Sequence, residues 1–270
     1  MREGLDETEV VMVTDKERGA GIRAAGLSDV GRCRQANQDQ FFVGQEFDVL
    51  AIADGMGGHA AGEIASDIAI AALAESMGRE GESRANWSST EAAERLRIAM
   101  NEGNRKICES VVTRAEWRGM GTTMVALVVI DGRAIVGHVG DSRAYLLREG
   151  RLRQLTSDHS WVNEQVKLGL LTEEEARRHP MRNIVTRALG NQPRVEVDVV
   201  EEEIRPGDVF ALCSDGLNGM ILDSEIEGTL AAHGQVPRSA CQTLVDQANT
   251  NGGEDNITVI VMAVPVAEKA

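Results

Sequence analysis

Several apolar runs of the sequence end or begin at an aspartate. Asp54, Asp141 and Asp215 each close such a run, and a fourth acid, Asp255, stands directly before another. Strands that lie side by side bring their ends together, so these four carboxylates could converge at one sheet edge. Buried acids repel one another and take up protons unless cations neutralise them. A ligand set of oxygen atoms, without His or Cys, favours Mg²⁺ or Mn²⁺ over Zn²⁺.

Each of these aspartates has an alternative explanation, because Asp-Gly is a common turn dipeptide. Asp131-Gly132, between two β-branched runs, predicts a plain hairpin turn. Asp54 and Asp215 differ because glycine-rich loops follow them. The loop after Asp54 lacks the Lys-Ser/Thr of a nucleotide P-loop and begins with an acid, which favours a cation over a cradled phosphate. Upstream, Arg34 could bind two phosphate oxygens, although a surface arginine is the ordinary interpretation.

The elements that must position these acids alternate between strand and helix patterns. Apolar and β-branched runs predict strands over residues 49–53, 122–130, 133–139, 145–147, 152–155, 195–200, 209–213 and 257–264. Amphipathic spacing predicts helices over residues 63–77, 91–112, 224–232 and 237–248. Successive hairpins with helices grouped between them favour antiparallel sheets with helical outer layers.

Residues 156–190 have a different character. They are polar and helix-leaning, and Thr172 to Glu175 form a capping pattern. We interpret this segment as an excursion from the sheet scaffold. Residues 1–25 are charged and weakly patterned, so we expect a short N-terminal extension followed by one domain over residues 26–266.

Composition limits the class of protein. A chain of 270 residues that is 42% hydrophobic can bury a substantial core. Its formal net charge of −15 argues against nucleic acid and anionic membranes as partners. The longest apolar run, residues 124–130, is too short to span a bilayer, and the N-terminus has no apolar signal core. We therefore expect a cytoplasmic protein, and a monomer.

At the aspartates described above and in the segments around them, the chain resembles the bacterial branch of the PP2C family, the metal-dependent protein phosphatases. The matching strings are Ser28-Asp-x-Gly-x-x-Arg34-x-x-Asn37-x-Asp39, Ala53-Asp-Gly-Met-Gly-Gly-His59, Gly121-Thr-Thr123, Val139-Gly-Asp-Ser-Arg-Ala-Tyr145, Ser214-Asp-Gly-Leu217 and Asp255-Asn256. They occur in family order over residues 26–264, and six strings in order are highly specific. The resemblance implies an α+β fold, a four-layer αββα sandwich of two antiparallel sheets flanked by helices.

The resemblance also implies two cations, Mg²⁺ or Mn²⁺, and a weaker third. Their implied ligands are Asp54, the carbonyl of Gly55, Asp215, Asp255, Asp39 and Asp141. Asp54 would bridge the first two cations, and Asp39 would hold metal-bound waters. Asp141, with Asp215, matches the third site.

On the substrate side, the resemblance implies that Arg34 binds the phosphate and that His59 protonates the leaving oxygen. His159, His179 and Arg182 would belong to a flap, residues 156–190, that touches substrate. The implied activity is hydrolysis of phosphoserine and phosphothreonine by direct attack of a metal-bridging water. The implied substrates are phosphoproteins, those of a serine/threonine kinase.

Two departures from the family pattern keep alternatives open. Gln38 stands where many members carry Glu, which predicts a weaker hold on the second cation, and Gly219 stands where many carry Asp. One alternative is therefore a catalytically weak member that serves as a regulatory or binding module. Another is a two-metal hydrolase acting on a small phosphoester or on nucleic acid, against which the acidic charge argues.

Overall fold

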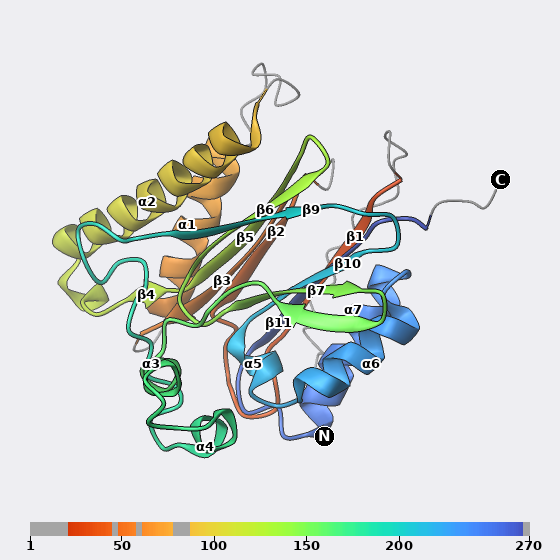
Figure 1. Ribbon diagram of the computed structural model, residues 1–270. Coiled ribbons are helices and arrows are strands. Elements are labelled where there is room, and N and C mark those ends of the chain that lie inside the picture. Colours follow the sequence, from red (N-terminus) through yellow and green to blue (C-terminus); the bar gives the residue numbers. More distant parts are fainter. Residues whose placement is uncertain (1–20, 45–47, 58–60, 78–86, 267–270) are drawn as a thin grey trace, which may run out of the picture.

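Two antiparallel β-sheets form the centre of the computed structural model, which describes residues 21–44, 48–57, 61–77 and 87–266 (Figure 1). The first sheet has the strand order β1 (Arg23–Asp29), β11 (Ile257–Ala263), β10 (Val209–Cys213), β7 (Arg143–Arg148) and β8 (Arg151–Gln154). The second has the order β2 (Asp39–Val43), β3 (Val49–Met56), β5 (Met124–Ile130), β6 (Arg133–Val139) and β9 (Asp198–Glu203), with β4 (Gly121–Thr122) paired to β3.

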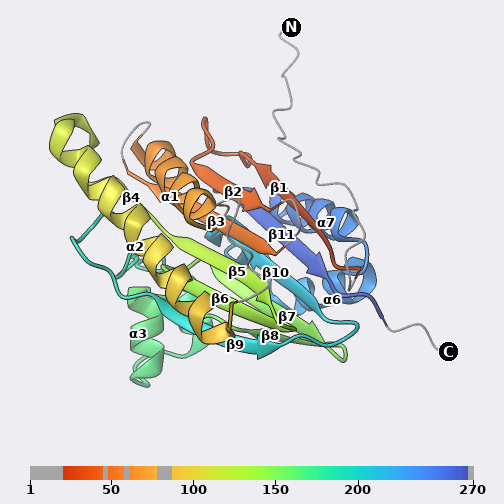
Figure 2. The same ribbon diagram turned by 90° about the horizontal axis from the view of Figure 1, so that it is seen from above.

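Helices cover the outer face of each sheet (Figure 2). The second sheet is covered by α1 (Ala61–Met77) and α2 (Ser89–Thr113), and the first by α6 (Asp223–His233) and α7 (Pro237–Thr250). The shorter helices are η2 (Ala115–Trp117), α3 (Trp161–Lys167), α4 (Glu173–Arg178) and α5 (Asp215–Asn218). This order of layers confirms the expected α+β, four-layer αββα sandwich. In the described part of the chain, no helix has the length and apolar character needed to cross a membrane.

The central strands are apolar along their whole length because both of their faces are buried. In β3, Leu50 and Ile52 point between the two sheets, whereas Val49 and Ala51 pack toward α1 and α2. Successive side chains of a strand point to opposite faces, so a strand inside a four-layer sandwich needs apolar residues at every position. Full burial of a Leu or Ile side chain contributes roughly 1.5–3 kcal/mol. The absence of polar alternation in residues 49–53 follows from this placement.

Two hairpin turns have the geometry that their sequences predict. Asp131 and Gly132 have φ angles of 48° and 69°, and Glu149 and Gly150 have φ angles of 53° and 76°. Positive φ at both central residues is the pattern of the type I′ turn, whose twist matches that of the strands it joins. The capping pattern of residues 156–190 is also confirmed, because Thr172 and Glu175 form a reciprocal capping box on α4.

Three strands differ from the expectation. β9 covers residues 198–203 instead of 195–200, because it is an edge strand and tolerates the acidic residues 201–203. β2 was not expected, because its apolar run, Phe41 to Val43, is only three residues long and its one buried residue is the acid Asp39. β1 begins at Arg23, before the expected domain boundary, whereas residues 1–20 of the expected extension lie outside the described residues.

Candidate metal centre

The carboxylate of Asp39 joins the two sheets at one end of the sandwich. Asp39 is the first residue of β2 and pairs directly with Asp54 of β3 in the second sheet. Its Oδ2 accepts a hydrogen bond of 2.7 Å from the Oγ of Ser214, which follows β10, and another of 2.7 Å from the Oγ1 of Thr258 in β11. Acids from both sheets therefore meet at this end, as the sequence predicts.

The turn that carries Asp215 packs closely against the segment that carries Asp255. Asp215 begins α5, and Asp255 stands two residues before β11. A Cβ atom at Gly216 would overlap the carbonyl oxygen of Asn256 and would lie 3.4 Å from the Cβ of Asp255. Only glycine allows this approach, so Gly216 is what permits the two acidic segments to lie together.

Asp141 follows β6 and is connected to Asp54 through hydroxyl groups. The Oγ1 of Thr123 accepts a hydrogen bond of 3.1 Å from the backbone N of Asp54. The same hydroxyl lies 2.7 Å from the Oγ of Ser142, the residue after Asp141. The side chain of Asp141 is buried, so its carboxylate joins the cluster from the second sheet.

The proximity of these acids raises their pKa values. Desolvation raises the pKa of Asp39 to about 7, although two hydroxyl hydrogen bonds oppose it. Desolvation and the charge of Asp255 raise the pKa of Asp215 to about 6. Desolvation and the neighbouring carboxylates hold the pKa values of Asp54 and Asp141 well above the ordinary range. A hard divalent cation would remove this repulsion, and the all-oxygen donor set fits Mg²⁺ or Mn²⁺.

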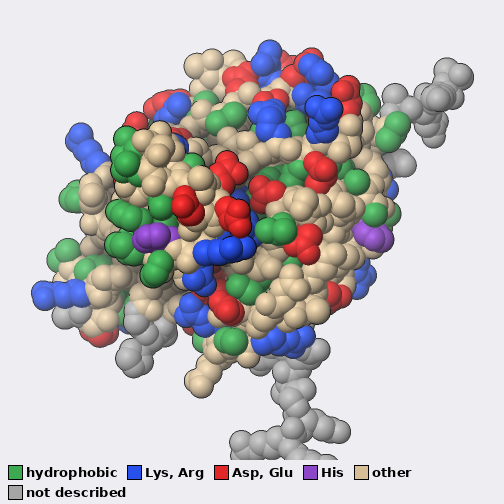
Figure 3. Space-filling view, turned by 60° about the horizontal axis from the view of Figure 1, so that its bottom comes forward, with side chains coloured by type: hydrophobic (Ala, Val, Ile, Leu, Met, Phe, Trp, Pro, Cys, Tyr) green, Lys and Arg blue, Asp and Glu red, His purple; other side chains and the backbone are tan. Residues whose placement is uncertain are grey.

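A cleft of about 430 Å³ opens beside the acids, and charged side chains gather around it (Figure 3). Arg34, Asp215 and Asp255 line one part of it. The side chain of Arg34 is half exposed, and its Nη2 lies 2.6 Å from the Oδ2 of Asp255. An accessible guanidinium beside a cation site is well placed to bind phosphate oxygens.

Residues of the flap, 156–190, form the opposite part of the cleft. Arg177 lines the cleft, and its Nη2 donates hydrogen bonds of 3.0 Å to the carbonyl oxygens of Asn218 and Ile221. These bonds attach α4 to the helix that begins with Asp215. Arg182 also lines the cleft and lies 3.5 Å from Glu254.

The three histidines with expected roles have different outcomes. His59 lies outside the described residues, so its role stays a prediction. His179 is partly exposed on the flap and packs against Trp161, with ring centres 5.0 Å apart. His159, expected to touch substrate, is a buried residue with only 6% of its surface exposed. Its Nδ1 accepts a hydrogen bond of 3.1 Å from the backbone N of Gly140.

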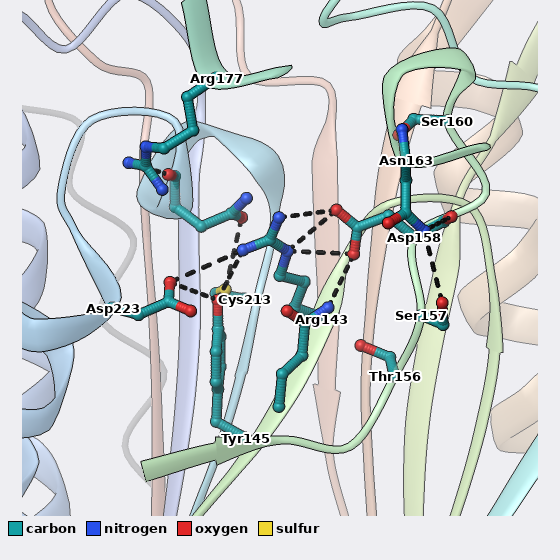
Figure 4. Close-up of polar contacts among 12 residues, drawn as sticks. Arg143, Tyr145, Thr156, Ser157, Asp158, Ser160, Asn163, Arg177, Cys213 and Asp223 are labelled. Carbon is teal, nitrogen blue, oxygen red and sulfur yellow. Dashed lines mark hydrogen bonds and ion pairs between the residues drawn. The ribbon is translucent and has the colours of Figure 1, made fainter. Parts of the chain in front are cut away.

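Sequence reasoning missed an ion-pair network around Arg143, which stands two residues after Asp141 (Figure 4). The Nε of Arg143 lies 3.0 Å from both carboxylate oxygens of Asp158, and its Nη2 donates to Oδ2 at 2.7 Å. Its Nη1 donates to the hydroxyl of Tyr145 at 3.0 Å and lies 3.6 Å from Asp223. Arg143 belongs to the motif from Val139 to Tyr145, but the sequence does not indicate which acid an arginine at this position pairs with.

A second group among the described residues has ligand types that a metal could use. Atoms of His138, His159 and Asp198 lie within 4.8 Å of one another. However, Arg187 already supplies a cation there, because its Nη1 lies 2.8 Å from Asp198 and 3.0 Å from the Nε2 of His159. The Nδ1 of His159 accepts a hydrogen bond from Gly140, and its Nε2 lies 3.2 Å from Asp198, so both ring nitrogens already have partners in the protein. This arrangement does not fit a metal ion.

The carboxylate cluster and Arg34 together define the class of protein. The acids need hard cations, and the cleft beside them presents a cationic group suited to phosphate. Two cations in such a site can activate water and neutralise a phosphoryl group. The class is therefore that of the metal-dependent phosphoester hydrolases.

Comparison with known proteins gives the family. The family model described as Protein phosphatase 2C matches residues 32–252. A serine/threonine phosphatase Stp of Listeria monocytogenes is 38% identical over 251 residues, which cover 92% of this chain and 98% of that protein. The protein phosphatase PhpP of Streptococcus pneumoniae is 41% identical over 248 residues, covering 88% and 96%.

A solved structure agrees with these relatives. The catalytic domain of the serine/threonine protein phosphatase PstP, in complex with two manganese ions, is 38% identical, with a TM-score of 0.78. The match covers 90% of this chain and 98% of that one. The chain belongs to the protein phosphatase 2C family.

Proposed function

We propose that this chain hydrolyses phosphoserine and phosphothreonine side chains of proteins, in a reaction that depends on Mg²⁺ or Mn²⁺. The observation that carries the proposal is the position of Asp39, which pairs with Asp54 and accepts hydrogen bonds from Ser214 and Thr258. Those contacts gather the acids of both sheets at one end of the cleft. The relatives named as serine/threonine phosphatases, and the manganese-bound structure, support the same activity.

The acids of the cluster would hold two cations. Asp54 would bridge them, Asp215 and Asp255 would complete the ligands of the first, and the carbonyl of Gly55 would bind the second. Asp39 would orient water molecules through its other carboxylate oxygen, since Oδ2 is already engaged by two hydroxyl groups. When bound, the cations supply an activated water and neutralise charge on the phosphoryl oxygens.

The remaining groups would position the phosphoryl group and complete the proton transfers. Transfer of a phosphoryl group depends on positioning and charge neutralisation more than on covalent help. Arg34 would bind the phosphate oxygens from its place beside Asp255. His59 would donate the proton that the leaving serine or threonine oxygen needs. Arg182 and His179 of the flap would contact the protein around the phosphorylated residue.

Asp141 would form a weaker third cation site together with Asp215. Asp141 and Asp215 line the same cleft, and the charge of Asp215 contributes to the raised pKa of Asp141. The substrates would be phosphoproteins, those of a serine/threonine kinase. A non-catalytic binding module has less support, because Asp54, Asp215 and Asp255 are all retained.

The test is phosphate release from a phosphothreonine peptide, in EDTA, in Mg²⁺ and in Mn²⁺. We expect release only with a cation, and a loss of roughly a thousandfold or more in Asp54→Asn, since an all-oxygen site would lose its bridging charge. Asp131→Asn is the matched control, because Asp131 lies in an exposed hairpin turn in which Asn is equally accepted. Equal activity of folded Asp54→Asn and Asp131→Asn would refute the proposed function.

A further inference from the structure

We propose that His159 is a positioning residue for Asp141, which it holds through the backbone of Gly140. The inference rests on the proposed function, because it gives His159 a role in the third cation site. His159 belongs to the flap in sequence, yet its side chain points away from the cleft and toward the end of β6.

His159 binds both polar groups of the Gly140 backbone. Its own backbone N donates a hydrogen bond of 3.0 Å to the carbonyl oxygen of Gly140. Its Nδ1 accepts a hydrogen bond of 3.1 Å from the backbone N of Gly140. The backbone N of His159 thus binds the peptide unit that joins Gly140 to Asp141. Its Nδ1 binds the preceding unit, which joins Val139 to Gly140.

The conformation of the chain at residue 140 requires glycine. Gly140 has a φ of +106°, a conformation that side chains rarely allow. A Cβ there would lie 2.6 Å from side-chain atoms of Thr123. Thr123 binds the backbone N of Asp54. Gly140 therefore lies between the residue that supports Asp54 on one side and His159 on the other.

His159 is in turn held by the C-terminal end of the flap and by residues of β6 and β9. Its Nε2 lies 3.2 Å from Asp198 of β9, which also binds Arg187, near the flap's C-terminal end, at 2.8 Å. Its carbonyl oxygen accepts a hydrogen bond of 2.8 Å from the backbone N of Thr186. Its ring stacks on His138, with ring centres 4.7 Å apart and planes inclined by 12°. These contacts leave the imidazole a single orientation.

The residue before His159 holds the other side of Asp141. Asp158 forms the ion pair with Arg143, which stands two residues after Asp141. Consecutive flap residues thus bind the chain just before and just after the carboxylate. A displacement of the flap base must therefore move Asp141, and a cation bound by Asp141 must in turn favour one flap position, since such coupling is reciprocal.

Two substitutions separate the contacts of the imidazole. In His159→Asn, the side-chain oxygen takes the place of Nδ1 and can still accept from Gly140, but nothing reaches Asp198. In His159→Gln, the amide takes the place of Nε2 and can reach Asp198, but the acceptor for Gly140 is lost. Removal of an outer partner of a metal ligand typically weakens metal binding 10- to 100-fold. We therefore expect the weakest Mn²⁺ site to weaken by about tenfold or more in His159→Gln, with His159→Asn close to wild type.

The measurement is calorimetric titration of the full chain with Mn²⁺, accompanied by hydrogen exchange of the Gly140 amide. Exchange should be faster in His159→Gln than in His159→Asn. Equal Mn²⁺ affinity in wild type and His159→Gln, or equal weakening in both variants, would overturn the inference. If His159→Gln does not fold, His159→Asn decides alone: retained affinity supports the role of Nδ1, and a tenfold loss contradicts it.

Asp141→Asn distinguishes failure of this inference from failure of the proposed function. If the third site exists, Asp141→Asn loses one Mn²⁺, and adding His159→Gln to it causes no further loss, because the two changes act on one site. If Asp141→Asn binds Mn²⁺ as wild type does, the proposed third site is wrong. If it loses the site but His159→Gln does not, only the positioning role is wrong.

Discussion

Replacing Arg143 with methionine should destabilise the protein more than any surface ion pair could. Arg143 and Asp158 have side chains that are only 19% and 11% exposed, and they share a bidentate contact. In Arg143→Met, Asp158 keeps its charge without a guanidinium, close to Asp141. Breaking one partner of a buried ion pair costs roughly 3–5 kcal/mol. For a chain of this size each kcal/mol lowers Tm by roughly 2–4 °C, so Tm should fall by roughly 6–20 °C.

The assay is thermal and urea-induced unfolding at neutral pH, and a double variant tests the cause. Arg143→Met with Asp158→Leu replaces both charges by apolar groups, which is often neutral in energy. We therefore expect the double variant to regain much of the stability that the single variant loses. A positive coupling of this kind identifies the unpaired carboxylate as the source of the loss.

Arg133→Met is the matched control. Arg133 also contacts an acid, Glu201, at 2.6 Å, but these side chains are 49% and 37% exposed. Exposed pairs contribute about 0.2–1 kcal/mol, so Tm should change little. The reasoning is refuted if Arg143→Met unfolds within 1 kcal/mol of Arg133→Met, or if Asp158→Leu does not rescue it.

Three further results are expected. In EDTA, the protein should become more stable as pH falls from about 8 to about 5. The folded-state pKa values are about 7 for Asp39 and about 6 for Asp215, above the unfolded value near 3.9. The folded state therefore binds more protons than the unfolded state in this pH range. Saturating Mn²⁺ should abolish this gain, because the cation requires ionised carboxylates, and Tm measured across pH with and without Mn²⁺ checks both statements. Arg34→Ala should lower kcat/KM for a phosphopeptide by roughly 10- to 100-fold, which corresponds to the loss of a charge-assisted hydrogen bond. The affinity for Mn²⁺ should change much less, and an unchanged KM would count against a contact between Arg34 and the phosphate. His59→Ala should lower kcat for a phosphothreonine peptide by roughly 10²- to 10⁴-fold but affect p-nitrophenyl phosphate far less, since that leaving group needs no proton; equal losses on both substrates would argue against a general acid.

The sequence could predict a site residue where that residue directly follows its own strand. Asp54 and Asp215 could be predicted because an apolar run followed by an acid and a glycine is a local pattern, and the run itself shows that the strand is buried. The hairpin at Asp131 could be separated from them because a second strand follows directly instead of a loop. The family resemblance then supplied what spacing alone could not, the assignment of each acid to a cation.

Long-range contacts could not be read in this way. The family resemblance implies that His159 touches substrate from the flap, but its partners are the backbone of Gly140 and the side chain of Asp198, 39 residues away. The hydroxyl groups of Ser214 and Thr258 were missed because serine and threonine beside a strand have many ordinary roles. The register of β2 places Asp39 opposite Asp54, and the packing of the two sheets brings it to these hydroxyl groups.

The strand order has a consequence for how the protein is made. β11, the last described strand, is inserted between β1 and β10, and Asp255 stands immediately ahead of it. A nascent chain in which β11 and the residues just before it have not yet been synthesised lacks the strand that joins β1 to β10. It also lacks Asp255, a proposed cation ligand. Because domains fold as units during synthesis, hydrolytic activity would appear only after β11 has been synthesised. Truncated chains would be inert toward phosphoproteins.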